Sequence, residues 1–76
     1  MSSVALVTGG NRGIGLAVAQ SLAAAGHDVV VTYRSGRPPV GFKSVIMDVT
    51  STESVDKAFD EIESAWGIPE IIVANA

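Results

Sequence analysis

A glycine-rich turn between two apolar segments limits what this chain can fold into more than any other feature. Residues 8–15 read Thr-Gly-Gly-Asn-Arg-Gly-Ile-Gly; they follow a β-type run at 4–7 and precede an alanine-rich helical run at 16–25. Glycines at 9, 13 and 15 allow the backbone to bend and to approach a ligand closely, and the first N–H groups of the helix attract anions. The sequence therefore predicts a phosphate-binding turn and, with it, a nucleotide site.

Two other glycine-rich nucleotide loops do not fit this turn. The common dinucleotide fingerprint has glycines at positions one, three and six, but a count that starts at Gly13 and Gly15 reaches Val18 at the sixth position. A nucleoside-triphosphate loop would continue after its last glycine with Lys and then Ser or Thr, where this chain has Leu16 and Ala17. The turn therefore belongs to a third type.

The spacing that fits is Thr-Gly-x-x-x-Gly-x-Gly, which resembles the first motif of the short-chain dehydrogenase/reductase family. Asp48 and Val49 follow a second apolar run, residues 45–47, as the family's adenine-binding Asp-Val pair does. Residues 71–76, Ile-Ile-Val-Ala-Asn-Ala, are similar to the family's fourth strand and the start of its Asn-Ala-Gly motif. The resemblance covers the whole chain and implies an α/β fold: a doubly wound, Rossmann-like parallel sheet with strand order 3-2-1-4, as a partial domain of residues 1–76 that stops after its fourth strand.

The second predicted strand, residues 28–33, indicates which nicotinamide cofactor the turn would bind. An acid at its end would accept hydrogen bonds from the adenosine ribose of NAD, but the strand is followed by Arg34. Arg34, together with Arg12 in the glycine turn, can face the 2′-phosphate of NADP, where one good charge-assisted hydrogen bond favours NADP by about tenfold or more. We therefore expect NADP(H). The alternative is that Arg34 and Arg37 are solvated loop charges.

Carried over by position, the resemblance implies a cofactor cleft with four parts. The glycine turn would hold the pyrophosphate, polar side chains the 2′-phosphate, the Asp-Val pair the adenine, and the last two residues the cofactor near its riboses. Asp48 has a second interpretation, as the neighbour of a helix cap. In the order of the four parts, the expected site residues are Gly9, Gly13, Ile14 and Gly15; Asn11, Arg12 and Arg34; Asp48 and Val49; and Asn75 and Ala76.

Within the family, the glycine turn, the Tyr-Arg strand end and the short crossover after it look most like the 3-oxoacyl-acyl-carrier-protein reductases of fatty acid synthesis, notably the mycobacterial type. That resemblance implies NADPH-dependent reduction of a substrate carried by acyl carrier protein, in a complete protein that is a homotetramer. The family's catalytic tyrosine, lysine, serine and further asparagine would follow residue 76, so the chain alone is expected to be inactive and contributes no catalytic residue. Tyr33 lies at the adenosine side and is not assigned to catalysis.

Two other functions stay open. The chain could belong to another member of the family that acts on a ketone, a sugar or a steroid. It could instead be a non-catalytic fragment that binds a nucleotide or a partner, because a fourth strand at the end of the chain leaves an exposed sheet edge that favours association.

Composition excludes several further classes. The chain has a net charge of −3, yet all its arginines fall at 12, 34 and 37, while five of the eight acids lie within 53–63. One local basic patch suits a small anionic ligand, whereas nucleic acid would need a broader basic surface. No segment is long enough to span a membrane, there is no signal-type leader, and cysteine is absent, so the sequence predicts a cytoplasmic protein. His27 has no neighbouring ligand residue, and no metal is expected.

Apolar spacing predicts two helices that cover the sheet. Thr50 to Glu53 read as a capping box ahead of the second helix, and the irregular Pro-rich crossover at 34–43 is too short for a helix. The inward positions are expected to be Ile14, Val18, Leu22 and Ala25 in the first helix, and Val55, Ala58, Phe59, Ile62 and Trp66 in the second.

Overall fold

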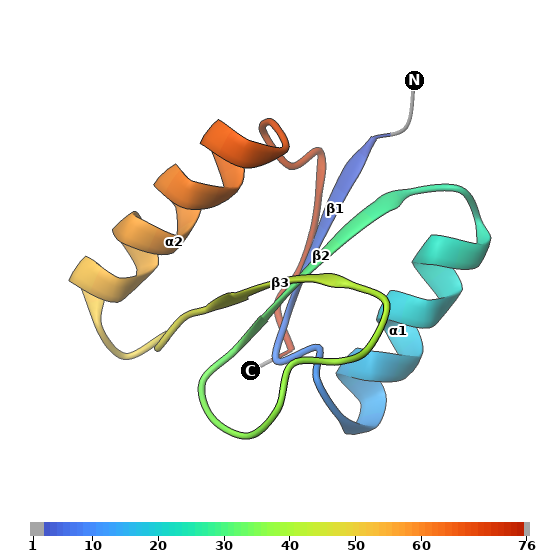
Figure 1. Ribbon diagram of the computed structural model, residues 1–76, viewed down its shortest axis with the longest axis horizontal. Coiled ribbons are helices and arrows are strands. Elements are labelled where there is room, and N and C mark those ends of the chain that lie inside the picture. The colour runs from blue at the N-terminus through green and yellow to red at the C-terminus, as the bar shows by residue number, and fades with distance from the viewer. Residues whose placement is uncertain (1–2, 76) are drawn as a thin grey trace.

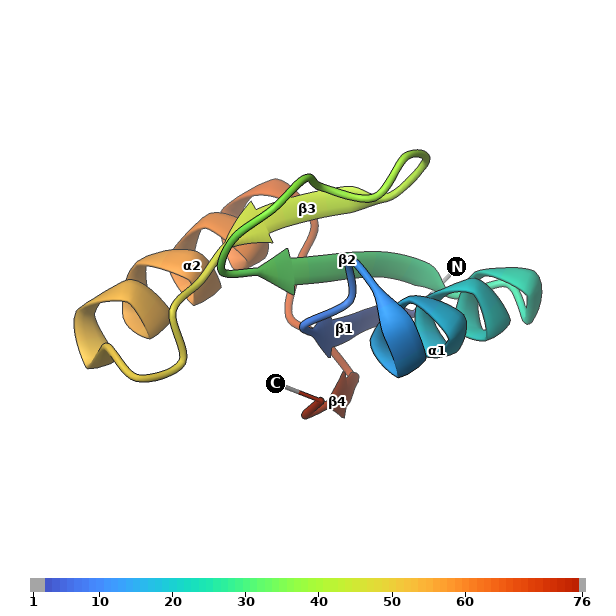
Figure 2. The same ribbon diagram turned by 90° about the horizontal axis from the view of Figure 1, so that it is seen from below.

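A computed structural model of this chain describes residues 3–75. Four parallel strands form one sheet in the order β3-β2-β1-β4. The predicted Rossmann-like sheet with strand order 3-2-1-4 is thus confirmed. Figure 1 and Figure 2 show α1 on one face of the sheet and α2 on the other. The elements along the chain are β1 (Val4–Thr8), α1 (Gly13–Ala24), β2 (Asp28–Tyr33), β3 (Lys43–Ile46), α2 (Thr52–Ala65) and β4 (Ile71–Val73).

Strands β1 and β2 are apolar along most of their length because helices cover both of their faces. Every residue of β1 is buried, and so are residues 29–32 of β2. A parallel sheet between two helix layers has little solvent-facing surface, so the alternation of apolar and polar residues disappears. In register, Leu6 of β1 lies beside Val30 of β2 and Ile72 of β4. The carboxyl ends of these strands therefore lie at the same end of the sheet.

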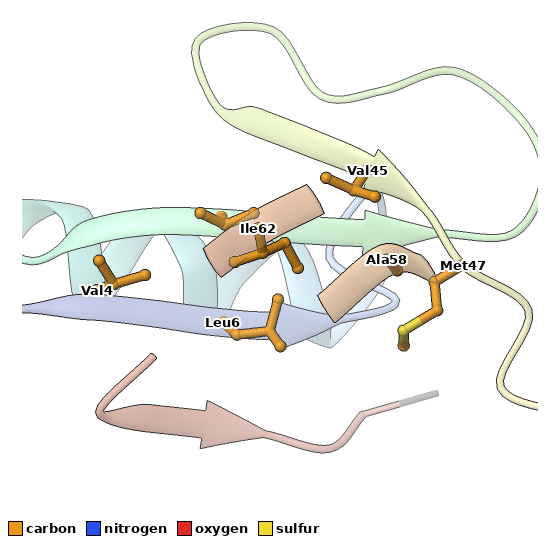
Figure 3. Packing of buried hydrophobic residues seen from close by; sticks show 7 residues of the cluster. Val4, Leu6, Val45, Met47, Ala58 and Ile62 are labelled. Atoms are coloured by element: carbon orange, nitrogen blue, oxygen red, sulfur yellow. The ribbon is translucent and has the colours of Figure 1, made fainter. Parts of the chain in front are cut away.

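Successive strand residues point to opposite faces, so the sheet has two apolar cores. Under α2, Leu6 and Val30 pack with Ala58 and Ile62 of the helix, and Figure 3 shows Leu6, Ala58 and Ile62 within this core. Trp66 packs against the same core, as the helical spacing predicts. The core under α1 is formed by the intervening strand residues and one helix residue, namely Ala5, Val7, Val29, Val31 and Ala19.

The buried face of α1 differs in part from the predicted one. Val18 and Leu22 pack against the core as expected, but Ile14 is 77% exposed and Ala25, which caps the helix end, is exposed as well. The buried helix residues are instead the small ones, Gly15 and Ala19. Small side chains on this face allow the helix to lie close to the sheet, so larger apolar residues are displaced to its flanks and beyond.

The N-terminus of α2 is capped one residue later than predicted. Ser51 is the N-cap, and its hydroxyl accepts a hydrogen bond from the Ser54 N–H over 3.2 Å. Thr50 does not cap the helix, because its N–H and hydroxyl both donate to Asp48. The predicted inward residues of α2 are confirmed: Val55, Ala58, Phe59, Ile62 and Trp66 all contact the core on that face.

The connection from β2 to β3 contains no helix or strand, as its proline content and length predict. Phe42, at its end, packs against the core under α1 and so anchors the crossover to the sheet. Within residues 3–75, neither helix is long and apolar enough to cross a membrane.

Candidate cofactor site

A cavity of about 560 Å³ opens where the carboxyl ends of the strands meet, which is where open α/β sheets bind their ligands. The segments that follow β1, β2 and β4 come together at this end of the sheet in Figure 1. Six of the predicted site residues line the cavity, namely Gly9, Asn11, Arg12, Arg34, Val49 and Asn75. The topology therefore assembles residues that are far apart in the sequence into one site.

Other predicted residues lie outside the lining. Gly13, Ile14, Gly15 and Asp48 are not part of the cavity wall, and Ala76 lies outside the described residues. Four residues that are not among the predicted site residues also line the cavity, namely Thr32, Ser35, Met47 and Tyr33, the last of which the sequence had placed at the adenosine side. All four lie at the end of β2 or just beyond β2 or β3, so strand-end position was the signal that could have found them.

The glycine turn has the backbone geometry that its sequence predicts. Gly9 and Gly13 have φ values of 65° and 60°, a left-handed region that other residues rarely adopt. Gly10 meets a different requirement: a Cβ there would lie 2.7 Å from Cγ1 of Val31, and its N–H donates to the Thr32 carbonyl oxygen over 3.1 Å. The turn therefore rests directly on β2, and Gly10 is a necessary residue that motif spacing did not mark.

Gly15 is needed for space and not for its φ angle. A Cβ added at this position would overlap both Nδ2 of Asn75 and the Gly9 carbonyl oxygen. These two atoms are joined by a hydrogen bond of 3.2 Å, in which the Asn75 amide donates. The absence of a side chain at Gly15 thus allows the end of β4 to be tied to the glycine turn.

Thr8 makes a second connection between β1 and the end of β4. Its hydroxyl accepts from the Asn75 N–H over 2.8 Å and donates to the Val73 carbonyl oxygen over 3.3 Å. Thr8 is only 8% exposed, so its buried hydroxyl is satisfied both as a donor and as an acceptor. Asn75 is therefore held from two sides at the cavity wall.

The cavity carries positive charge. Arg12 and Arg34 both line it, and both residues are exposed. Across residues 3–75, no carboxylate belongs to the lining, and the one salt bridge joins Lys43 to Asp28 at the amino-terminal end of β2 and β3. In the described part of the chain neither guanidinium is engaged in an ion pair, so both can bind an anion.

Asp48 is occupied by a local hydrogen-bond arrangement. Its Oδ1 accepts from the Thr50 hydroxyl over 2.7 Å and from the Thr50 N–H over 3.0 Å. These two bonds, hydroxyl first, lower the pKa of the Asp48 carboxyl below its ordinary value. Burial acts in the opposite direction, and the charge of Arg34, the smallest of the four effects, lowers the pKa further. The contacts support the helix-cap interpretation of Asp48; its contact with adenine stays a prediction.

The glycine turn, the strand ends and the basic cavity lie together at the carboxyl end of the sheet. Residues 3–76 match the family model described as short chain dehydrogenase. The chain therefore belongs to the short-chain dehydrogenase family, a class of oxidoreductases that use nicotinamide cofactors. The left-handed glycine turn and the two guanidiniums of the cavity wall fit a cofactor that carries a pyrophosphate.

The chain is similar to two curated relatives and to one solved structure. It is 53% identical over 76 residues to the 3-oxoacyl-acyl-carrier-protein reductase MabA of Mycobacterium tuberculosis, a match covering 100% of this chain and 31% of the relative. It is 41% identical over 85 residues to the reductase FabG of Aquifex aeolicus, covering 96% of this chain and 34% of that protein. The ligand-free aldohexose dehydrogenase of Thermoplasma acidophilum has a TM-score of 0.90 at 28% identity, with 99% of this chain and 29% of that chain covered. The chain spans about a third of the length of these relatives.

Proposed function

We propose that residues 1–76 are the NADP(H)-binding part of a short-chain reductase that reduces 3-oxoacyl-acyl-carrier-protein in fatty acid synthesis. The observation that carries the cofactor assignment is the cavity wall: Arg12 and Arg34 line it, and the lining within residues 3–75 contains no carboxylate. An acid at the end of the second strand would favour the ribose hydroxyls of NAD, and that position is occupied by arginine.

The charge of the 2′-phosphate determines how strongly NADPH is preferred over NADH. A 2′-phosphate carries up to two negative charges, and each charge-assisted hydrogen bond to it is worth about 1.5–3 kcal/mol. One such bond to Arg12 or Arg34 favours NADPH over NADH by about tenfold or more, since about 1.4 kcal/mol corresponds to a factor of ten. The adenine would lie against the strand ends at Met47 and Val49, which line the same cavity.

The substrate assignment rests on the identity to the mycobacterial reductase over the whole chain. In this proposal, the catalytic residues and the site for the acyl-carrier-protein-linked substrate belong to the remaining part of a protein as long as its relatives. This chain alone binds NADPH without turnover. The complete protein is proposed to be a cytoplasmic homotetramer. For this chain we expect a small anionic ligand and not a nucleic acid, because Arg12 and Arg34 lie together at one cavity.

A second substrate class is favoured by a specific likeness. The backbone agrees with that of the aldohexose dehydrogenase at a TM-score of 0.90, so the same cofactor half also fits a family member that acts on a sugar. Ketone and steroid reductases of the family would share this half as well. These alternatives keep the cofactor site and change only the substrate.

A titration of the purified chain with NADPH and, separately, with NADH tests the cofactor assignment. Nucleotide fluorescence gives the affinity, and the melting temperature reports stabilisation of the folded state by the bound ligand. We expect saturable binding with NADPH preferred. Equal binding of the two cofactors would refute the 2′-phosphate assignment, and failure of a folded chain to bind either one would favour the non-catalytic, partner-binding alternative.

A further inference from the structure

The side chain of Asn11 does not point its donor group at open cavity space. Its Nδ2 donates to the Ser35 carbonyl oxygen over 3.1 Å and to the Arg37 carbonyl oxygen over 3.3 Å. An amide nitrogen has two hydrogens, so these bonds use its full donor capacity. The remaining polar atom, Oδ1, is an acceptor and is repelled by a phosphate oxygen.

These two hydrogen bonds attach residues 35–40 to the glycine turn. Within residues 3–75, they are the only hydrogen bonds that join residues 35–40 to another part of the chain. The segment also lacks helix and strand structure. Gly36 turns the chain sharply between the two carbonyl groups, with a φ of 85°. A Cβ on Gly36 would lie 3.4 Å from Nδ2 of Asn11, so the amide fits closely into the turn.

Arg34 lies directly before this turn and lines the cavity. The backbone on its other side is fixed where the Gly10 N–H donates to Thr32. We infer that Asn11 is a positioning residue: its amide holds the turn of residues 35–37, and through it the Arg34 guanidinium, at the place where the 2′-phosphate binds. This inference rests on the proposed NADP(H) site and assigns Asn11 an indirect part in cofactor choice.

The position of Asn11 explains how an exposed arginine can discriminate between cofactors. A long side chain on an unsupported loop loses much of its binding energy because the loop must be ordered on binding. Because Asn11 of the glycine turn already fixes residues 35–37, this segment is ordered when the protein folds and not when the cofactor binds. Asn11 thereby connects the glycine turn, which would bind the pyrophosphate, to the segment that holds Arg34 at the 2′-phosphate.

A double-mutant cycle tests this inference. NADPH and NADH affinities are measured for the unmodified chain, Asn11→Ala, Arg34→Ala and the double variant. We expect Asn11→Ala to weaken NADPH binding by about tenfold and NADH binding by less than about twofold. The double variant should bind NADPH as Arg34→Ala does, because Asn11 acts through Arg34. Independent, additive losses would identify Asn11 as a direct ligand and overturn the positioning role.

Amide hydrogen exchange in the absence of cofactor separates this inference from the proposed function. Asn11→Ala should increase exchange at residues 35–37, and unchanged exchange there would overturn the inference even if NADPH binds. If the unmodified chain shows no preference for NADPH, the proposed cofactor fails while the exchange result still decides the role of Asn11. Gly36→Ala provides a second variant: it strains the same turn and should selectively weaken NADPH binding, and unaltered NADPH affinity would count against the inference.

Discussion

The side-chain amide of Asn75 donates a hydrogen bond of 3.2 Å to the Gly9 carbonyl oxygen and so ties the end of β4 to the glycine turn. A Cβ at Gly15 would overlap both bonded atoms. The glycine turn and the end of β4 lie at opposite ends of the sequence. They can be joined by this hydrogen bond only because Gly15 has no side chain. This connection shapes one wall of the cavity.

Gly15→Ala is expected to destabilise the fold by about 1–3 kcal/mol, because the added methyl overpacks a site bounded by backbone. The free energy of unfolding from urea denaturation measures the loss. Gln20→Ala, on the exposed side of the same helix, is the control and should change stability by less than about 0.5 kcal/mol. Wild-type stability in Gly15→Ala would contradict the close packing of the turn against Asn75.

Thr8→Val should cost about 1–3 kcal/mol of stability, because it removes the hydroxyl that serves both Asn75 and Val73 and leaves these groups without their partner. Thr8→Ser keeps the hydroxyl and serves as the matched control, with a smaller loss. Because valine keeps the methyl group of threonine, unchanged stability in Thr8→Val would show that the two hydrogen bonds do not stabilise this position.

Thr50→Val is expected to raise the pKa of Asp48 toward its ordinary value of 3.8, because the hydroxyl bond is the largest cause of the lowered pKa. The pKa should stay somewhat below that value, since the Thr50 N–H still donates. A carboxyl with a lowered pKa contributes stability above its unfolded-state pKa and loses it as pH falls through the folded-state pKa. This contribution should therefore be present at neutral pH and lost in acid below 3.8.

An NMR titration of the Asp48 carboxyl carbon measures this effect directly. Thr52→Val, an exposed change in the first turn of the same helix, is the control and should leave the titration unchanged. If Thr50→Val leaves the Asp48 pKa where it was, the hydroxyl is not its cause.

Strand β4 pairs only with β1, so its other side is a sheet edge in the described part of the chain. Ile72 on this strand is 55% exposed, and we expect the chain to self-associate through the edge as concentration rises. Ile72→Lys should reduce association in sedimentation velocity, whereas Val40→Lys, at a 98% exposed crossover position, should not. A monomeric, cooperatively melting chain at all concentrations would disprove the prediction.

Much of the fold follows from local sequence patterns. Continuous apolar runs such as β1 and β2 predict strands that are buried on both faces. The helical spacing of Ala58, Ile62 and Trp66 predicts the inner face of α2, because the buried residues of a helix recur every three to four positions. The glycine turn likewise marks the site, since left-handed φ angles at Gly9 and Gly13 leave few other residues possible.

Contacts between distant segments could not be predicted in this way. The exposure of Ile14 depends on how closely α1 approaches the sheet, and the need for Gly10 depends on Val31 beneath it. The partners of Asn11 in the crossover were also beyond reach, because a polar side chain near a predicted ligand site reads as a ligand until its hydrogen bonds are known. Packing and hydrogen bonding across the sequence decide these roles.

The central claim, that this cavity is a 2′-phosphate site, is tested most directly by the affinities of NADPH and NADH for the unmodified chain and for Arg34→Asp. Lys57→Asp makes the same change of charge at an exposed position of α2, outside the cavity, and is the control. We predict that Arg34→Asp lowers NADPH affinity by about tenfold or more while NADH affinity changes little, because the new carboxylate repels the 2′-phosphate and can accept from ribose hydroxyls. Equal losses for the two cofactors would contradict the assignment.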